Sequence, residues 1–413
     1  MKRRPAIVFI LITLLLDVMG FGLLLPVLPA LVGEFTTSRD AQTYWYGAMI
    51  VTFGLTQFFC SPLLGALSDR FGRRPVLLGS IAGLGTMFLL SALATSLTGL
   101  LLARVLGGVL AANFAVANAY VADLTTPENR AKSFGLIGAA FGIGYIVGPM
   151  VGGLLGSIDI RLPVYVAAGL SALNFLYGLL VVPESLPAER RKPLQWKRAN
   201  PITSLRGLTK LRAVGVLVAV IAVANLAQFI LHSTWVLFTD FRFGWGPRET
   251  GFSLFVVGLM AALVQGGLLG WLMRTLGERR VVLAGLASGT LAYVAYGLTT
   301  VGWLMYVVIV ANVLAFAVGP ALSAIVSKAT DPGEQGLAMG SLTSLSALMA
   351  VTAPFIGTPL LASVSHLPAG DWRIGAPFFM SAVLSLTAFV LAFKHFRRHP
   401  AASVAHVAPL TRG

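Results

Sequence analysis

An acidic residue, Asp17, lies in the middle of a long apolar segment, where an ionised side chain is expensive. The surrounding sequence reads IVFILITLLLDVMGFGLLL, and the other acidic residues lie in loops or near the ends of apolar segments. A carboxylate at mid-membrane depth is costly unless it is paired, neutral or hydrated. Low dielectric favours its protonated form and a nearby cation favours its ionised form. Asp17 is therefore a candidate proton-coupling residue, and a permanent buried ion pair is the alternative interpretation.

Arg104 is the candidate partner of Asp17, because it is the basic residue that falls inside an apolar segment. Counting roughly 1.5 Å per helical residue from the segment ends places the two side chains at similar depths. We expect them to face each other, so that protonation of Asp17 releases Arg104. Removal of one partner should then be more harmful than removal of both, because it strands a charge.

Uncharged polar side chains recur in other apolar segments. Asn225, Gln228 and His232 have the spacing i, i+3, i+7, so they share one face of a helix. Polar groups are costly toward lipid, so they should point into a substrate cavity or into interhelical hydrogen bonds. The grouped face favours substrate contact, whereas a lone histidine such as His232 is more often structural. The other cavity candidates are Gln57, Asn113, Asn118 and Asn312.

The stretch GALSDRFGRRP, residues 65–75, places one acid and three arginines between two apolar segments. Its glycines permit a tight turn, and its arginines favour the cytoplasmic side. Neither the turn nor the cytoplasmic orientation explains the acidic residue Asp69. We expect Asp69 to contact a helix N-terminus near Ser341, in the second half of the chain. Asp123 is expected to pair with Arg70 or Arg73. The candidate cytoplasmic gate comprises Gly65, Asp69, Arg70, Gly72, Arg73 and Asp123.

The composition requires a membrane to hold these residues. The 413 residues are 57% hydrophobic and 11% charged, with a mean hydropathy of +0.85, whereas a soluble globular chain is roughly 25% charged. Continuous apolar runs indicate helices rather than a β-barrel. Twelve spans are predicted at 6–29, 43–65, 75–95, 98–122, 132–156, 162–182, 212–238, 248–270, 280–299, 301–326, 336–362 and 372–394.

Basic residues predict the orientation. If both termini are cytoplasmic, 24 of the 30 lysines and arginines lie on the inner side and five on the outer side. The net charge of +15 is therefore a topology signal, and no nucleic-acid partner is expected. The basic, proline-containing segment 183–211 separates an N-terminal six-helix half (1–182) from a C-terminal half (212–413). We expect a multi-pass protein of the inner membrane, and a monomer.

The two halves repeat with a constant offset of 205 residues. Landmarks that coincide include Gly72 with Gly277, Arg74 with Arg279 and Pro149 with Pro354. Six helices per half is an even number, so both halves have the same orientation. The sequence thus predicts an all-α membrane protein of two pseudo-symmetric six-helix halves.

These features together resemble the major facilitator superfamily, and several motifs resemble its drug/proton antiporters. LLARVLGG (101–108) is similar to their fourth-helix arginine motif. LLDVMGFGLLLPVLP, AYVADLTTPENRA and VVPES resemble the tetracycline/proton antiporter branch. The resemblance implies alternating access by rocking of the halves, with helices 1, 4, 7 and 10 lining a central cavity.

GYIVGPMVGG resembles the fifth-helix motif of proton-driven exporters. Its small residues leave one side of the helix without side chains, and its proline tolerates a bend. We expect a tight, bendable contact with the other half, for which ordinary small-residue packing is the alternative. The motif residues are Gly144, Gly148, Pro149, Gly152 and Gly153.

The tetracycline branch has acidic residues in helices 3 and 9 and a histidine in helix 8. The corresponding positions in this sequence are Met87, Ser288 and Met260, so all three ionisable groups are missing. We therefore expect proton-coupled export of amphipathic organic compounds, with tetracycline-like compounds among the candidates. Small-molecule substrate, protons and lipid are the expected partners. A metabolite exporter or facilitator without proton coupling is the alternative, and a receptor or scaffold follows. An enzyme is the least expected, because no metal-ligand, nucleotide-binding or nucleophile motif is present, and no cofactor or metal is expected.

Overall fold

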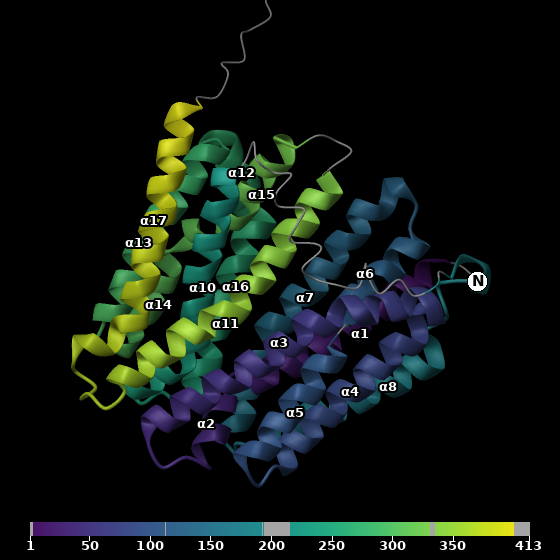
Figure 1. The fold of residues 1–413 in the computed structure, drawn as a ribbon, viewed down its shortest axis with the longest axis horizontal. Helices are drawn as coiled ribbons and strands as arrows, with labels where there is room; N and C mark the ends of the chain where they lie inside the picture. The colour runs from purple at the N-terminus through teal and green to yellow at the C-terminus, as the bar shows by residue number, and fades with distance from the viewer. Residues whose placement is uncertain (1–2, 112, 192, 194–214, 331–334, 400–413) are drawn as a thin grey trace, which may run out of the picture.

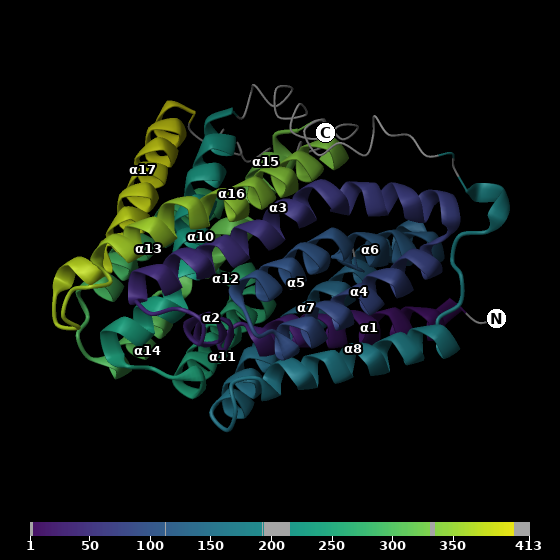
Figure 2. The ribbon, with the colours of Figure 1, turned by 60° about the horizontal axis from the view of Figure 1, so that its bottom comes forward.

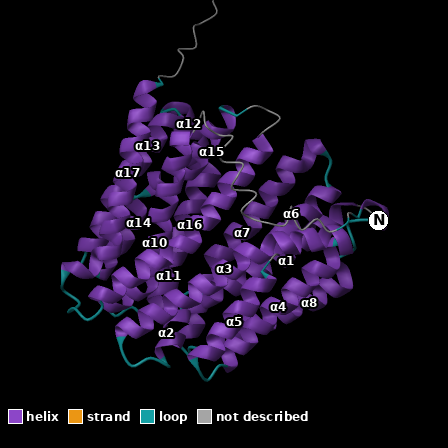
Figure 3. Cartoon of the chain, in the orientation of Figure 1, coloured by secondary structure: helices purple, strands orange, loops and turns teal. Residues whose placement is uncertain are grey.

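The computed structural model describes residues 3–111, 113–191, 193, 215–330 and 335–399, and the regular structure in these ranges is helical without any strand (Figure 3). The first part of the chain forms α1 (Arg3–Leu24), α2 (Leu28–Gly33), α3 (Arg39–Phe71), α4 (Arg73–Leu93), α5 (Leu97–Leu110), α6 (Asn113–Leu124), α7 (Pro127–Gly156), α8 (Leu162–Val181) and the short turn η1 (Ala188–Arg190). Most of the predicted segment 183–211 lies outside the described residues.

The second part of the chain forms a matching series of helices. It comprises α10 (Gly215–Phe243), α11 (Pro247–Leu263), the π-helical turn η4 (Val264–Leu268), α12 (Leu269–Thr275), α13 (Glu278–Leu298), α14 (Gly302–Ala311), η5 (Val313–Ala317), α15 (Val318–Lys328), α16 (Gln335–Val364), η6 (Trp372–Gly375) and α17 (Ala376–Arg398).

The apolar helices are consistent with the twelve predicted spans. In the described ranges, ten helical stretches are long and apolar enough to cross a membrane, and α14 with the segment Val313–Lys328 makes an eleventh if this pair, bent by 48°, is one span. The first predicted span, 6–29, is shorter than expected. Its apolar helix is Val8–Leu24, and the chain turns before α2. Pro26 and Pro29 lie there, and proline cannot donate a backbone hydrogen bond.

The helices form two groups, α1–α8 and α10–α17, that meet along two seams. Within the first group α1 packs on α7 and α8, and within the second α10 packs on α16 and α17. The seams pair α3 with α16 and α7 with α11 (Figures 1 and 2). Because α3 corresponds to α11 and α7 to α16 in the internal repeat, the two seams are equivalent.

Both seams are tight at one end of the molecule. A methyl group added to Gly47 of α3 would lie 2.2 Å from Oγ1 of Thr358 on α16. A methyl group added to Gly153 of α7 would lie 3.0 Å from Cα of Gly251 on α11. Such separations are shorter than van der Waals contact, so these glycines are required for the close approach. We call this end of the molecule the far face.

The two groups separate toward the opposite end, which carries residues 65–75, where α3 ends and α4 begins at Gly72, and the end of α17. We call this end the basic face. There, methyl groups added to Gly138 of α7, Gly270 of α12 or Gly340 of α16 would meet no other atom within 4 Å. Figure 1 shows the helix groups spreading apart toward α6, α12 and α15. The halves are thus joined at the far face and parted at the basic face.

The internal repeat is visible in the backbone. Gly72 and Gly277 have φ angles of +108° and +79°, a region that favours glycine, and each ends the loop that precedes a helix. The following arginines also act alike. Arg74 donates to the carbonyl of Leu179 near the end of α8, and Arg279 donates to the carbonyl of His399 just after α17. The predicted 205-residue repeat therefore produces equivalent turns with equivalent contacts.

The predicted outer arginines include two that bind helix ends at the far face. Arg161 donates to the carbonyls of Ala92 and Ala94, both at 2.8 Å. Arg242 donates to the carbonyls of Thr299 (3.0 Å) and Ala369 (2.9 Å). The carbonyls of Ala92, Ala94 and Thr299 lie at helix C-termini and have no partner within their own helices, so the arginines satisfy them. The carbonyl of Ala369 lies in the turn between α16 and η6.

Candidate functional site

Two chambers meet between the helix groups. Leu25 and Tyr145 line both of them, so the chambers adjoin at these two side chains. Apart from Leu25, Tyr46 and Tyr145, the residues that line one chamber belong to the second helix group, α10–α17, and we call it the C-terminal chamber. The other is formed by α1, α3, α4, α7, Leu25 and Ala111, and we call it the N-terminal chamber.

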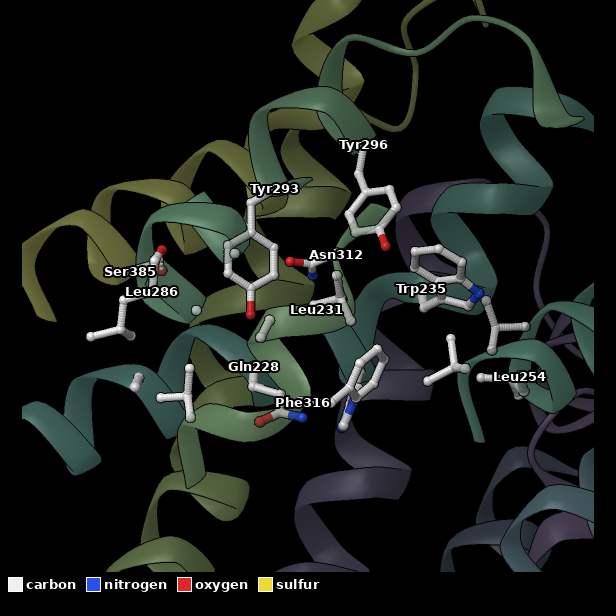
Figure 4. Close-up of a pocket in the computed structure, with 18 of the residues that line it drawn as sticks. Gln228, Leu231, Trp235, Leu254, Leu286, Tyr293, Tyr296, Asn312, Phe316 and Ser385 are labelled. Atoms are coloured by element: carbon white, nitrogen blue, oxygen red, sulfur yellow. Dashed lines mark hydrogen bonds between the residues drawn. The ribbon is translucent and has the colours of Figure 1, made fainter. Parts of the chain in front are cut away.

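The C-terminal chamber is aromatic and carries amides. Gln228 and Trp235 reach it from α10, and Tyr293 and Tyr296 from α13 (Figure 4). His232 of α10 also lines this chamber. The Nε1 of Trp235 donates to Ser253 Oγ at 3.0 Å, which fixes the ring. Such a surface, apolar with a few oriented polar groups, suits an amphipathic organic molecule.

Asn312 also lines this chamber, and it accepts a hydrogen bond from Ser288 Oγ at 2.9 Å. It lies at the bend between α14 and η5. Ser288 is one of the three positions that are polar in the tetracycline branch, so here a neutral hydroxyl orients a cavity amide. Met87 is fully buried against Gly107, and Met260 packs at the edge of the hydrophobic core.

The N-terminal chamber contains Asp17, whose residue surface is 5% exposed. Its Oδ1 accepts a hydrogen bond of 2.9 Å from Nδ2 of Asn174 on α8. Phe21, Phe53 and Phe141 form apolar walls of the same chamber. Among the described residues that line the two chambers, Asp17 is the acidic one, so the carboxylate sets the local charge of the cavity.

The predicted contact between Asp17 and Arg104 does not form, and no ion pair joins them in the described part of the chain. Arg104 is 5% exposed, and its Nη2 has no hydrogen-bond partner among the described residues. The reason lies in the packing: α5, which carries Arg104, packs on α3 and α4, whereas α1 packs on α7 and α8. Equal depth along two helices does not make their side chains neighbours.

The predicted cavity amides have different positions. Gln57 lines the N-terminal chamber and donates to the carbonyl of Ala111 at 3.3 Å. Asn225 and Gln228 line a further pocket beside the C-terminal chamber, where Asn225 Nδ2 donates to Ser346 Oγ at 2.8 Å. Asn118 lies on α6 outside both chambers. The side chain of Asn113 falls outside the described part of the structure.

Sequence reasoning missed three tyrosines of this site, which are Tyr46, Tyr293 and Tyr296. The last two recur at i, i+3 within the apolar segment LAYVAYGL. That pattern is the available signal, because a tyrosine hydroxyl inside a membrane span requires a polar neighbour or a cavity. Tyr145, an aromatic candidate for the cavity walls by sequence, follows the first glycine of the GYIVGPMVGG motif and lines both chambers.

The segment of residues 65–75, which the sequence places between two apolar segments, is helical except for Gly72, and its contacts centre on Arg73. Its guanidinium contacts Asp69 Oδ1 (2.7 Å), Asp123 Oδ2 (3.1 Å) and Ser68 Oγ (2.7 Å). Of the two expected partners of Asp123, the structure thus contains Arg73. Arg70 instead stacks over the ring of Phe71, with its Cζ 5.1 Å from the ring centroid. A methyl group added to Gly65 would have no neighbouring atom within 4 Å, so no close packing requires a glycine there.

Glu184, which follows α8, is a further partner of this segment that sequence reasoning missed. Its carboxylate accepts from the backbone N–H groups of Arg73 (2.9 Å) and Arg74 (3.2 Å), at the start of α4. The pairing satisfies two unpaired donors and places a negative charge at a helix N-terminus. A methyl group on Gly72 would lie 2.4 Å from Glu184 Oε2, so this glycine also makes room for the carboxylate. Glu184 is the acidic residue of the motif VVPES, and that motif is the sequence feature that could have identified it.

Asp69 does not reach the second helix group in this structure. Its ion pair with Arg73 lies within one helix-loop-helix unit, and its side chain is 47% exposed. The halves are apart at the basic face, so a contact with α16 near Ser341 would require the other arrangement of the halves. The latch therefore stays a prediction.

The glycine motif of α7 is divided between two neighbours. Methyl groups added to Gly144, Gly148 or Gly152 would collide with α1, at distances of 2.9, 2.8 and 2.4 Å. Gly153 instead contacts α11 of the second group, as does the carbonyl of Pro149. Most of the motif thus serves packing within one half, and its far-face end forms the seam with the other half.

Comparison with known proteins agrees with this architecture. The family model described as Major Facilitator Superfamily matches residues 10–354 and 268–409. The Escherichia coli protein "Tetracycline resistance protein, class C" is 38% identical over 387 residues, covering 94% of this chain and 97% of the relative. "Multidrug resistance protein 2" of Bacillus subtilis (strain 168) is 27% identical, covering 94% and 95%.

A solved structure extends the comparison. The crystal structure of the human organic anion transporter MFSD10 (TETRAN) superposes with a TM-score of 0.68 at 28% identity, covering 95% of this chain and 100% of that one. The helix arrangement, the internal repeat and the matched residues lead to one conclusion: this multi-pass membrane protein belongs to the Major Facilitator Superfamily.

Proposed function

We propose that this protein exports amphipathic organic compounds in exchange for protons, by alternating access. The observation that carries the proposal is the cavity between the halves, in which an aromatic, amide-bearing chamber adjoins a chamber that contains the buried carboxylate of Asp17. The first chamber supplies binding for an organic molecule. The second supplies a group that can take up and release a proton.

The proposed cycle uses both arrangements of the halves. Substrate enters the cavity from the basic face, which we place at the cytoplasm, and leaves after the halves rock about the seams α3–α16 and α7–α11. Asp17 takes a proton on the outer side and releases it on the inner side. We place the protein in the inner membrane as a monomer with both termini cytoplasmic, and we propose transport rather than catalysis.

Tetracycline-like compounds are among the candidate substrates. The matched relatives named for tetracycline resistance support this choice, and the departures at Met87, Met260 and Ser288 argue for a broader range of compounds. The multidrug relative supports that breadth.

Transport into everted membrane vesicles tests the proposal. Vesicles from cells that produce the protein are energised, and uptake of tetracycline and of the fluorescent cation ethidium is followed with and without an uncoupler. We expect uptake of at least one compound, its loss with the uncoupler, and its loss in Asp17→Asn. Energy-independent exchange of substrate should persist in Asp17→Asn, because binding and rocking remain.

Asp159→Asn is the matched control, because Asp159 is an exposed acid in the loop after α7. It should transport as the wild type does. Uptake that is insensitive to the uncoupler would instead support the alternative function, an exporter or facilitator without proton coupling. No accumulation of any compound by a well-folded protein would contradict the proposal.

A further inference from the structure

A buried asparagine on α8 holds the carboxylate of Asp17. Asn174 is 0% exposed, and its Nδ2 donates to Asp17 Oδ1 at 2.9 Å and to the backbone carbonyl of Thr13 at 3.0 Å. Because α8 packs along α1, the amide lies between the two helices. The amide itself does not line the N-terminal chamber, whereas Asp17 does.

The orientation of this amide is fixed by its second contact. A backbone carbonyl can only accept, so the oxygen of Thr13 requires the NH₂ end of Asn174 to face α1. Turning the amide over would set Asn174 Oδ1 against that carbonyl and would remove both hydrogen bonds. Asn174 Oδ1 has no hydrogen-bond partner among the described residues. Asn174 therefore offers Asp17 a donor and no acceptor.

A fixed donor distinguishes the two protonation states of a carboxyl group. It binds the ionised form strongly, because hydrogen bonds to charged groups are stronger than neutral ones. The O–H of the protonated form must find its acceptor elsewhere, on the side of the chamber. We propose that Asn174 is a positioning residue that favours ionised Asp17 and so sets the pH range in which Asp17 exchanges its proton.

Other titratable groups near α1 have their own places. Among the described side chains of the packed helices these are Tyr120 and Asp123 of α6, Tyr145 of α7, and Tyr165 and Tyr177 of α8. Asp123 is paired with Arg73, and Tyr165 is exposed. Tyr120 donates to the carbonyl of Pro183 at 2.7 Å, and the ring of Tyr177 packs edge-on against Phe9. Tyr145 shares the N-terminal chamber with Asp17 and is neutral at physiological pH. The amide of Asn174 is thus a fixed contact that responds to the charge of Asp17.

Infrared difference spectroscopy of the full-length protein in lipid vesicles measures the protonation of Asp17 without requiring transport. Spectra taken across a pH series report the C=O stretch of protonated carboxyl groups. The band that is absent in Asp17→Asn belongs to Asp17, and its amplitude against pH gives the midpoint. Asn174→Leu removes the donor at similar volume, and Asn174→Ala removes it without added bulk.

We expect the midpoint to move to higher pH in both variants, because loss of the donor penalises the ionised form. The expected shift is roughly one to two pH units. Ser171→Ala is the matched control: Ser171 is buried one turn earlier on α8, and its midpoint should equal that of the wild type. Thermal unfolding and size-exclusion profiles identify variants that fold.

An unchanged midpoint in a folded variant, or a shift to lower pH, would overturn the inference. The inference rests on the proposed function, because it concerns the proposed coupling residue, but the two can fail separately. A shifted band together with transport that ignores the proton gradient would retain the role of Asn174 and reject proton coupling. Uncoupler-sensitive transport together with an unshifted band would retain proton coupling and reject the role of Asn174.

Discussion

Arg73 and Asp123 form an ion pair at the basic face, and the residues 205 positions further along form one with the charges exchanged. Arg73 Nε lies 3.1 Å from Asp123 Oδ2, and Lys328 Nζ lies 2.5 Å from Glu278 Oε1. Each pair joins the residue after a positive-φ glycine to the end of a later helix, α6 in the first half and α15 in the second. The repeat thus fixes the position of the pair, and its polarity distinguishes the two halves.

Exchange of the charges should be tolerated in the second half and not in the first. Glu278→Lys or Lys328→Glu alone should cost at most about 1 kcal/mol, because Lys328 is 71% exposed. The double exchange should restore the pair. Exchange of Arg73→Glu with Asp123→Arg should not, because the new glutamate would face Asp69, which contacts Arg73 at 2.7 Å. Thermal stability and transport of the four single and two double variants measure this. Equal restoration in both halves would contradict it.

A bulky side chain at the far-face seam should hold the halves apart there. Gly153→Val places methyl groups where even a Cβ would lie 2.4 Å from the carbonyl oxygen of Pro247. We expect transport to fall at least about tenfold while the protein still folds, because each half packs on its own helices. Vesicle uptake and size-exclusion profiles measure the two properties.

Gly169→Val on α8 is the control for that variant, because an added methyl group at Gly169 meets nothing within 4 Å. It should transport normally. If Gly153→Val also transports normally, the seam opens and closes without needing this close approach.

The latch predicted for Asp69 can be tested by cross-linking. In a Cys60→Ser background, Asp69→Cys with Ser341→Cys should form a disulfide only when the basic face closes. The far-face substitution Gly153→Val should raise the yield, because it disfavours the arrangement in which the halves are apart at the basic face. A yield that is the same with and without Gly153→Val would show that these positions do not report closure of the basic face.

Arg104 should be more important for transport than for stability. Its side chain is buried, and its Nη2 has no partner in the described residues. A buried charge with incomplete compensation destabilises the fold, so an apolar replacement is often neutral or stabilising. We expect Arg104→Met to keep or raise the melting temperature while uptake is lost. A large fall in melting temperature would assign Arg104 a structural ion pair instead.

Much of the architecture follows from the sequence because its causes are local. Hydropathy sets which segments enter lipid, and basic residues predict which loops stay out. A tight turn at positive φ needs a glycine wherever it falls, so the repeated glycines Gly72 and Gly277 indicate equivalent turns by themselves. The pairing of Asp123 with Arg73 is also within reach of sequence reasoning, since both lie at helix ends on one side of the membrane.

The partners of buried side chains are decided by tertiary packing. Position along a helix gives depth in the membrane, but contact also requires the right rotation and the right neighbouring helix. Asp17 and Arg104 share a predicted depth, yet Asp17 contacts Asn174 because α1 packs on α8 and not on α5. The same reason divides the glycine motif, where Gly152 faces α1 and Gly153, one residue and about 100° further around the helix, faces α11.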